Sequence, residues 1–255
     1  QVFVPEMRKE IHFFDWYYDR GLSWYQKWFP PKENNYKAVG EFTPNYLYDE
    51  NTFLRVKEIC PDAKLIIMLR DPVRRAYSHY QMNFQSGDGQ EYSSFDDFME
   101  NHLHAFNRGL YASQIELWLS KFDKENFLII ISEEIFKKED GINQLFKKIS
   151  LFLNIDLNLF NIDLAKERVG KARLAPKYKL LANTAQKVRL FLRKHDLDFV
   201  AIFFKKIGLT RQIFGSSSVS IPELTKNDIE KWSKRYAEDR KKLEFLLEQK
   251  FVYWD

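Results

Sequence analysis

The sequence predicts a three-layer α/β fold, in which helices cover both faces of a central parallel sheet. Two short and almost wholly apolar runs, 64–69 and 127–131, have the composition of strands that are buried on both faces. Stretches with the apolar spacing of helices lie before, between and after these runs. Because strands that alternate with helices form parallel sheets with right-handed crossovers, we expect a ligand site at the carboxyl ends of the strands.

A third strand is expected at 36–42, where the apolar pattern is weaker and Thr43-Pro44 stops it. With this strand, each predicted strand has a polar residue at its carboxyl end. In chain order these residues are Glu41, Arg70 and Ser132.

The clearest helix is predicted directly after Arg70. Asp71 is a good N-cap, and Pro72 suits the first helical position because its missing N–H needs no partner there. Apolar residues then recur at helical spacing from Val73 to Phe84, so one face should pack inward. Further helices are predicted at 51–59, 94–101, 110–122, 142–153, 177–193 and 222–249.

Length and composition fit one domain over residues 1–255, with 45% hydrophobic residues for a core. The net charge of +4 is too small for a dedicated nucleic-acid binder, so we expect no nucleic-acid partner. One cysteine excludes an internal disulfide, and the five histidines show no metal-ligand spacing, so no metal is expected. No apolar stretch reaches the roughly 18 residues of a membrane span, and no signal-peptide pattern opens the chain. We therefore expect a cytoplasmic location.

The junction after the 64–69 strand has the residues of an anion site. Arg70 ends the strand, a helix N-terminus follows, and Ser78 lies further along that helix. A guanidinium and a hydroxyl near the start of a helix can hold a phosphate. The same residues also fit an Arg–Asp surface pair before an ordinary capped helix, so the pattern alone leaves both interpretations open.

Residues 69–81, Leu-Arg-Asp-Pro-Val-Arg-Arg-Ala-Tyr-Ser-His-Tyr-Gln, resemble the 3'-phosphate motif of sulfotransferases that use PAPS (3'-phosphoadenosine 5'-phosphosulfate). The likeness is to the heparan sulfate enzymes and their bacterial relatives. It implies a P-loop nucleotide-kinase-like fold and an enzyme that moves a sulfuryl group from PAPS to an acceptor, leaving PAP. It also implies that Arg70 and Ser78 bind the 3'-phosphate, and that the reaction needs no metal.

Residues 9–16, Lys-Glu-Ile-His-Phe-Phe-Asp-Trp, resemble a second segment of the same enzymes. The resemblance implies that Glu10 is the catalytic base and that His12 and Asp15 orient it or the acceptor. A carboxylate beside an aromatic cluster is partly desolvated and more basic, as proton abstraction requires. Without the resemblance, an exposed Glu10 next to a structural histidine explains the same residues.

Two more segments carry the likeness to the nucleotide site. Residues 109–111, Gly-Leu-Tyr, resemble a family helix in which Tyr111 lines the nucleotide pocket, although a buried aromatic fits equally. Residues 168–173 resemble the late loop that closes over the 3'-phosphate, and a solvated basic turn is the alternative. The resemblance makes nucleotide-binding candidates of Gly170, Lys171 and Arg173.

The sequence departs from the family in two places. Phe42 stands where the heparan sulfate enzymes have an active-site lysine, which argues against a glycosaminoglycan acceptor. The Lys-x-Gly-Thr-Thr/Ser loop that holds the 5'-phosphosulfate does not occur, and the resemblance predicts that this loop and the first strand precede Gln1.

Several functions therefore stay open. The first is an enzyme that acts on a hydroxyl or amine of a glycan, lipid or small molecule. The second is a non-catalytic nucleotide- or glycan-binding domain of the same fold. A nucleotide kinase is disfavoured because no Gly-Lys-Ser/Thr motif is present. Aromatic residues between Trp16 and Trp28 fit either a sugar-stacking wall or a core.

Overall fold

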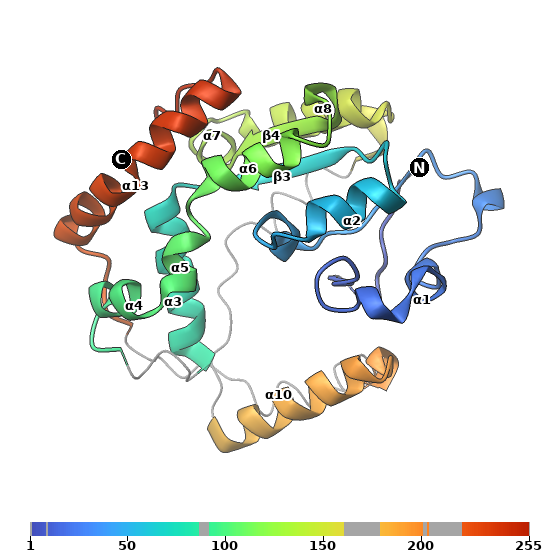
Figure 1. The fold of residues 1–255 in the computed structure, drawn as a ribbon, viewed down its shortest axis with the longest axis horizontal. Coiled ribbons are helices and arrows are strands. Elements are labelled where there is room, and N and C mark those ends of the chain that lie inside the picture. Colours follow the sequence, from blue (N-terminus) through green and yellow to red (C-terminus); the bar gives the residue numbers. More distant parts are fainter. Residues whose placement is uncertain are drawn as a thin grey trace. The chain divides into compact units, whose positions relative to one another are not determined.

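The computed structural model describes residues 2–8, 10–86, 92–160, 179–200, 203 and 221–254, and within them the chain is an α/β structure with parallel strands (Figure 1). The chain divides into two compact units. The first contains 1–72, 110–169 and 234–255, and the second contains 73–109 and 170–233. One domain over the whole chain stays a prediction, and the units are described one at a time.

The first unit contains two pairs of parallel strands. The pairs are β1 (Val2–Phe3) with β2 (Ala38–Val39), and β3 (Leu65–Leu69) with β4 (Phe127–Ile131). The strands predicted at 64–69 and 127–131 are thus confirmed, and they pair in parallel as expected. The strand predicted at 36–42 is only two residues long, because the segment after Gly40 turns into the 3₁₀ helix Pro44–Leu47. In the described residues the two pairs do not join into one sheet.

The predicted helices are present, with shifted ends. The first unit holds α1 (Leu22–Gln26), α2 (Thr52–Ile59), α6 (Tyr111–Leu119), α7 (Ser132–Lys137) and α8 (Gly141–Leu153). Helix α3 (Pro72–Ser86) belongs to the second unit apart from its first residue, Pro72, which belongs to the first. The second unit also holds α4 (Phe95–Asn101), α5 (Leu103–Asn107) and α10 (Lys179–Lys194). The last helix, α13 (Lys226–Leu247), has residues in both units. No helix of the described residues is long and apolar enough to cross a membrane.

Local sequence explains two of the helix starts. Helix α3 begins at Pro72, as predicted from the Asp-Pro pair. Helix α13 begins four residues later than the predicted Pro222, because Thr225 and Asp228 cap it reciprocally. The Asp228 N–H donates to Thr225 Oγ1 at 3.1 Å, and the Thr225 N–H donates to Asp228 Oδ2 at 3.0 Å.

Two apolar clusters form the core of the first unit. One packs the segment 11–29 against α2 and α6, and its buried members are Ile11, Phe13, Phe14, Trp24, Tyr25, Phe53, Val56, Trp118 and Phe122. The other packs the ends of β3 and β4 against α6 and the last residues, with Leu69, Tyr111, Ala112, Ile115, Ile131, Leu243, Phe251 and Trp254. These clusters fix the two segments that carry the predicted chemistry, 10–16 and 69–71.

Aromatic side chains also form the core of the second unit. Tyr80 of α3 and Phe98 of α4 are fully buried, with ring centroids 5.2 Å apart. Val73 is fully buried as well, so the inward face predicted for α3 is confirmed. Trp232 is fully buried and packs on Phe106, with ring centroids 5.9 Å apart.

Candidate functional site

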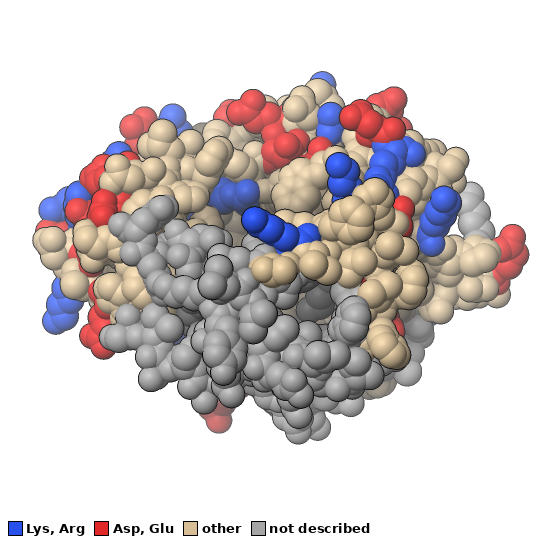
Figure 2. Space-filling model, turned by 90° about the horizontal axis from the view of Figure 1, so that it is seen from below, with Lys and Arg blue, Asp and Glu red and all other residues tan. Residues whose placement is uncertain are grey.

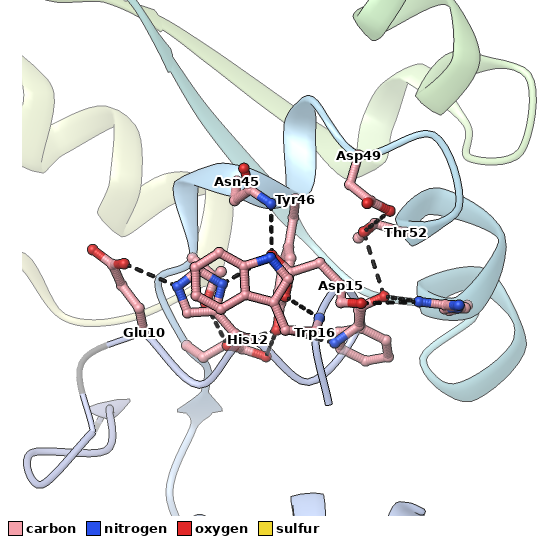
Figure 3. A network of polar contacts seen from close by, with 12 residues as sticks. Glu10, His12, Asp15, Trp16, Asn45, Tyr46, Asp49 and Thr52 are labelled. Carbon is pink, nitrogen blue, oxygen red and sulfur yellow. Dashed lines mark hydrogen bonds and ion pairs between the residues drawn. The ribbon is translucent and has the colours of Figure 1, made fainter. Parts of the chain in front are cut away.

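The segment 10–16 forms a tight turn around His12, which has a left-handed backbone with φ of 57° (Figure 3). The carbonyl oxygen of His12 accepts hydrogen bonds from the N–H groups of Trp16 and Tyr17, at 3.1 and 3.0 Å. Non-glycine residues rarely adopt this conformation, because the Cβ atom crowds the next carbonyl. The turn therefore brings three polar side chains together at the cost of local strain.

Glu10, His12 and Asp15 form a continuous chain of hydrogen bonds (Figure 3). His12 Nδ1 donates to Asp15 Oδ2 at 2.9 Å, and His12 Nε2 lies 3.2 Å from Glu10 Oε2. The His12 side chain is 4% exposed and the Asp15 side chain is fully buried, whereas the Glu10 side chain is 43% exposed. The chain of hydrogen bonds thus leads from a buried carboxylate to one that solutes can reach.

Asp15 is held in its ionised form. Burial by itself raises the pKa of the Asp15 carboxyl, but hydrogen bonds from His12 and Asn45 outweigh it, so the pKa lies below its usual value of 3.8. Asn45 Nδ2 donates to Asp15 Oδ2 at 2.7 Å, and the Trp16 N–H donates to Oδ1 at 2.8 Å. An ionised Asp15 keeps the proton on His12 Nδ1 and so presents Nε2 to Glu10.

Trp16 covers His12 from the side of the solvent. The two rings are stacked with their planes 2° apart, and the indole is 60% exposed. Of the aromatic residues that fit either a sugar-stacking wall or a core, Trp24 and Tyr25 are buried in the core. Trp16 is the member of this set that faces outward over the hydrogen-bonded chain (Figure 3).

A second polar cluster supports the segment through Glu41. Its carboxylate accepts hydrogen bonds from the hydroxyls of Tyr25 and Thr43, both at 2.8 Å, and of Tyr46, at 3.1 Å. Burial raises the pKa of Glu41 above its usual 4.5, although these hydrogen bonds and one from the Ile11 N–H oppose the shift. Glu41 thus ties α1 and the 43–46 turn to the segment that carries His12.

Helix α2 holds the same segment from another direction. Arg55 Nη1 donates to the carbonyl oxygens of Phe14 and Asp15, at 2.7 and 3.3 Å. The Phe14 N–H donates to the Tyr46 hydroxyl at 3.3 Å. Both backbone groups of Phe14 therefore have side-chain partners, which fixes the path of the chain through the site.

The predicted nucleotide residues lie in several parts of the chain. Arg70 directly follows β3 and its side chain is exposed, and the Tyr111 hydroxyl donates to the Arg70 carbonyl oxygen at 3.0 Å. Arg70 belongs to the first unit and Ser78, in α3, to the second, so their shared contact with a phosphate stays a prediction. The predicted loop residues Gly170, Lys171 and Arg173 lie outside the described residues.

Charge is not concentrated on the surface in Figure 2, where Lys and Arg side chains and Asp and Glu side chains are both spread over the described residues of that face. This agrees with the small net charge of +4. In the part of the chain that the structure describes, no group of three or more His, Cys, Asp or Glu side chains could hold a metal ion.

Comparison with known proteins identifies the family. The family model described as "Sulfotransferase domain" matches residues 2–196. This chain belongs to the sulfotransferase domain family. The predicted resemblance is thereby confirmed, and the matched residues include both the segment with Glu10 and the junction at Arg70.

The sulfotransferase domain is also similar to individual curated proteins. Heparan sulfate glucosamine 3-O-sulfotransferase 6 of Mus musculus is 32% identical over 146 residues, which cover 54% of this chain and 42% of that protein. Membrane-associated sulfotransferase kil1 of Dictyostelium discoideum is 42% identical over 80 residues, which cover 31% of this chain and 17% of that protein. The chain thus spans less than half the length of these relatives.

A solved structure supports the predicted fold. The crystal structure of a sulfotransferase from Alicyclobacillus acidocaldarius matches with a TM-score of 0.65 and 20% sequence identity, covering 99% of this chain and 88% of that one. At this identity the likeness concerns the fold. The α/β sulfotransferase fold predicted from the sequence is therefore confirmed.

Asn45, Glu41 and Arg55 are site residues that the sequence did not single out for this role. Asn45 lies 30 residues from Asp15 along the chain, and Arg55 lies 41 residues from Phe14. A signal existed for Glu41, because it lies at the carboxyl end of the strand predicted at 36–42, where a ligand site was expected.

Proposed function

We propose that this protein transfers a sulfuryl group from PAPS to a hydroxyl or amine of an acceptor, and that Glu10 removes the acceptor's proton. The observation that carries the proposal is the chain from Asp15 through His12 to Glu10 within a sulfotransferase domain. A partly exposed carboxylate backed by a buried imidazole has the arrangement of a general base.

In the proposed reaction, the acceptor oxygen or nitrogen forms a bond to sulfur while the bond from sulfur to the 5'-phosphate oxygen breaks. The acceptor's proton moves to the Glu10 carboxylate, and PAP leaves with the electron pair of the broken bond. His12 Nε2, 3.2 Å from Glu10, can share that proton, and ionised Asp15 stabilises the imidazolium that results. These residues act on the acceptor side of the reaction.

On the donor side, we propose that Arg70 and Ser78 bind the 3'-phosphate of PAPS. A guanidinium makes charge-assisted and bidentate hydrogen bonds to phosphate, and the Arg70 side chain is exposed to a ligand. We propose that Gly170, Lys171 and Arg173 belong to a loop that closes over the 3'-phosphate. The donors that stabilise the 5'-phosphate leaving group stay a prediction of the family likeness.

For the acceptor, we propose a carbohydrate that carries less negative charge than heparan sulfate. The relatives are named for heparan sulfate glucosamine, and Trp16 presents an exposed indole beside Glu10 on which a sugar ring can stack. Phe42, also 60% exposed, supplies no cation where the heparan sulfate enzymes have a lysine.

The test is transfer of labelled sulfate from PAPS to a panel of acceptors: heparan sulfate, neutral oligosaccharides, a glycolipid and a small alcohol. We expect neutral oligosaccharides to be sulfated, and Glu10→Gln to lower kcat by at least about 100-fold. PAP affinity measured by calorimetry should stay within about twofold, because Glu10 acts on the acceptor. Glu6→Gln, which changes an exposed glutamate, is the matched control.

The outcomes separate the candidate functions. Equal turnover by Glu10→Gln and wild type would refute Glu10 as the base. Binding of PAP without transfer to any acceptor would favour the non-catalytic binding domain, the alternative that Phe42 motivates. Absence of PAP binding would reject both the enzyme and a nucleotide-binding domain, and would leave only a glycan-binding domain.

A further inference from the structure

The peptide unit that joins Arg70 to Asp71 is held by two side chains. It lies one step beyond the last paired residues of the β3–β4 ladder, Leu69 and Ile131, and is therefore outside that ladder. The Tyr111 hydroxyl donates to the Arg70 carbonyl oxygen at 3.0 Å, and the Asp71 N–H donates to Glu133 Oε1 at 3.0 Å. Because both groups belong to one planar peptide unit, the two hydrogen bonds together fix its orientation.

The second carboxylate oxygen of Glu133 also accepts hydrogen bonds. Glu133 Oε2 accepts hydrogen bonds from Trp254 Nε1 and from the Ser132 hydroxyl, both at 3.1 Å. Glu133 is 6% exposed and Trp254 is 4% exposed, so water competes little for these contacts. A buried carboxylate with several donors is restricted to one rotamer, and its contact with Asp71 is correspondingly well defined.

Trp254 is anchored by α13. Arg240 donates from Nη1 to the Trp254 carbonyl oxygen and from Nη2 to that of Phe251, both at 2.6 Å. The indole stacks on Phe251 with ring centroids 4.2 Å apart, and it contacts Tyr111 at 5.9 Å. The last residues thus form a rigid support that reaches the peptide after β3 through both Glu133 and Tyr111.

We propose that Tyr111, Glu133 and Trp254 are positioning residues that aim Arg70 at the 3'-phosphate of the donor nucleotide. The fixed orientation of the peptide after Arg70 constrains the Arg70 backbone and therefore the direction of the Arg70 Cα–Cβ bond. The Arg70 side chain itself stays exposed. The inference rests on the proposed function, since Arg70 is the group that these residues would serve. It assigns a role in donor binding to Glu133 and Trp254, which the sequence did not single out, and a contact with the Arg70 backbone to Tyr111.

The test measures PAP affinity by calorimetry in Tyr111→Phe and Trp254→Phe, each with and without Arg70→Ala. Tyr111→Phe keeps the ring, Trp254→Phe replaces the indole with a smaller aromatic ring, and each removes one hydrogen-bond donor. In the presence of Arg70 we expect affinity to fall about five- to tenfold, which is the loss of one hydrogen bond. In the Arg70→Ala background we expect no further loss, because the positioned group is gone.

Two controls separate positioning from general destabilisation. Trp118→Phe changes another buried tryptophan of the first unit, and Tyr80→Phe removes a buried hydroxyl that has no partner among the described residues. Both should leave PAP affinity unchanged.

Three results would overturn the inference. One is unchanged PAP affinity in both positioning variants, and another is an equal loss of affinity with and without Arg70. If the wild-type protein fails to bind PAP, the proposed function and this inference fall together.

Discussion

The indole ring of Trp16 lies flat on the imidazole ring of His12, with the ring centroids 3.8 Å apart. One face of the indole shields the histidine, and 60% of the side chain remains exposed. The same residue therefore protects the inner part of the site and offers an apolar surface next to Glu10.

Replacement of Trp16 tests this surface. We expect Trp16→Ala to raise the KM for a carbohydrate acceptor about tenfold, since stacking contributes about 0.5–1.5 kcal/mol beyond the area it buries. Trp16→Phe should keep most of the affinity. Steady-state kinetics with varied acceptor measure this, and Phe245→Ala, which removes an aromatic that is 87% exposed, is the control. An unchanged KM in Trp16→Ala would contradict the stacking role.

Asn45 is expected to matter for turnover because it holds Asp15. Asn45→Ala removes the 2.7 Å hydrogen bond to Asp15 and should lower kcat about fivefold, with PAP affinity unchanged. Asn45→Asp should lower it further, because a second carboxylate would face Asp15. Asn101→Ala, in which an exposed amide bonded to Asp97 is removed, should have no effect on kcat. If the two substitutions at Asn45 leave kcat unchanged, Asn45 does not position Asp15.

Asp15 should make the protein sensitive to acid. Its pKa is lower in the folded protein than the 3.8 of the unfolded chain, so the ionised carboxylate stabilises the fold above pH 3.8. That stability is lost as the pH falls below 3.8 through the folded pKa. Chemical unfolding at a series of pH values should show Asp15→Asn less stable than wild type near neutral pH. The difference between the two proteins should shrink below pH 3.8, and a difference independent of pH would contradict the shift.

Glu41 should show the opposite sign of pH dependence. Burial raises its folded pKa above the 4.5 of the unfolded chain, so the folded state favours the protonated form. Stability should therefore fall as the pH rises from 4.5 through the folded pKa. Glu41→Gln should lack this decline in the same unfolding series. A decline of equal size in the variant would show that another group causes it.

Patterns of neighbouring residues correctly predicted two strands and the start of α3. The strands 65–69 and 127–131 are continuous apolar runs, and the start of α3 is set by an Asp-Pro pair, so neighbours in sequence decide both. Ser132 was expected only as a strand end, but it begins α7 at once. A helix that starts without a turn leaves little signal in composition.

The candidate site likewise contains some contacts that neighbouring residues predict and others that they do not. Glu10, His12 and Asp15 lie within six residues, and the motif that contains them was sufficient to predict their association. The supports come from distant segments: Asn45 for Asp15, and Glu133 for the peptide after Arg70, 62 residues away from Asp71. Such contacts depend on how elements pack, and no periodicity along the chain encodes them.

The left-handed backbone of His12 costs conformational free energy, whereas the His12 side chain makes the contacts of the site. A φ of 57° costs a non-glycine residue about 1 kcal/mol, whereas glycine adopts it freely. Every L-residue placed there bears this penalty, and in this chain the histidine connects Asp15 to Glu10 through its two ring nitrogens. His12→Gly would relieve this penalty, but it would also remove the buried hydrogen bond to Asp15 and the stacking on Trp16, so the contacts of the side chain retain a strained backbone at the centre of the site.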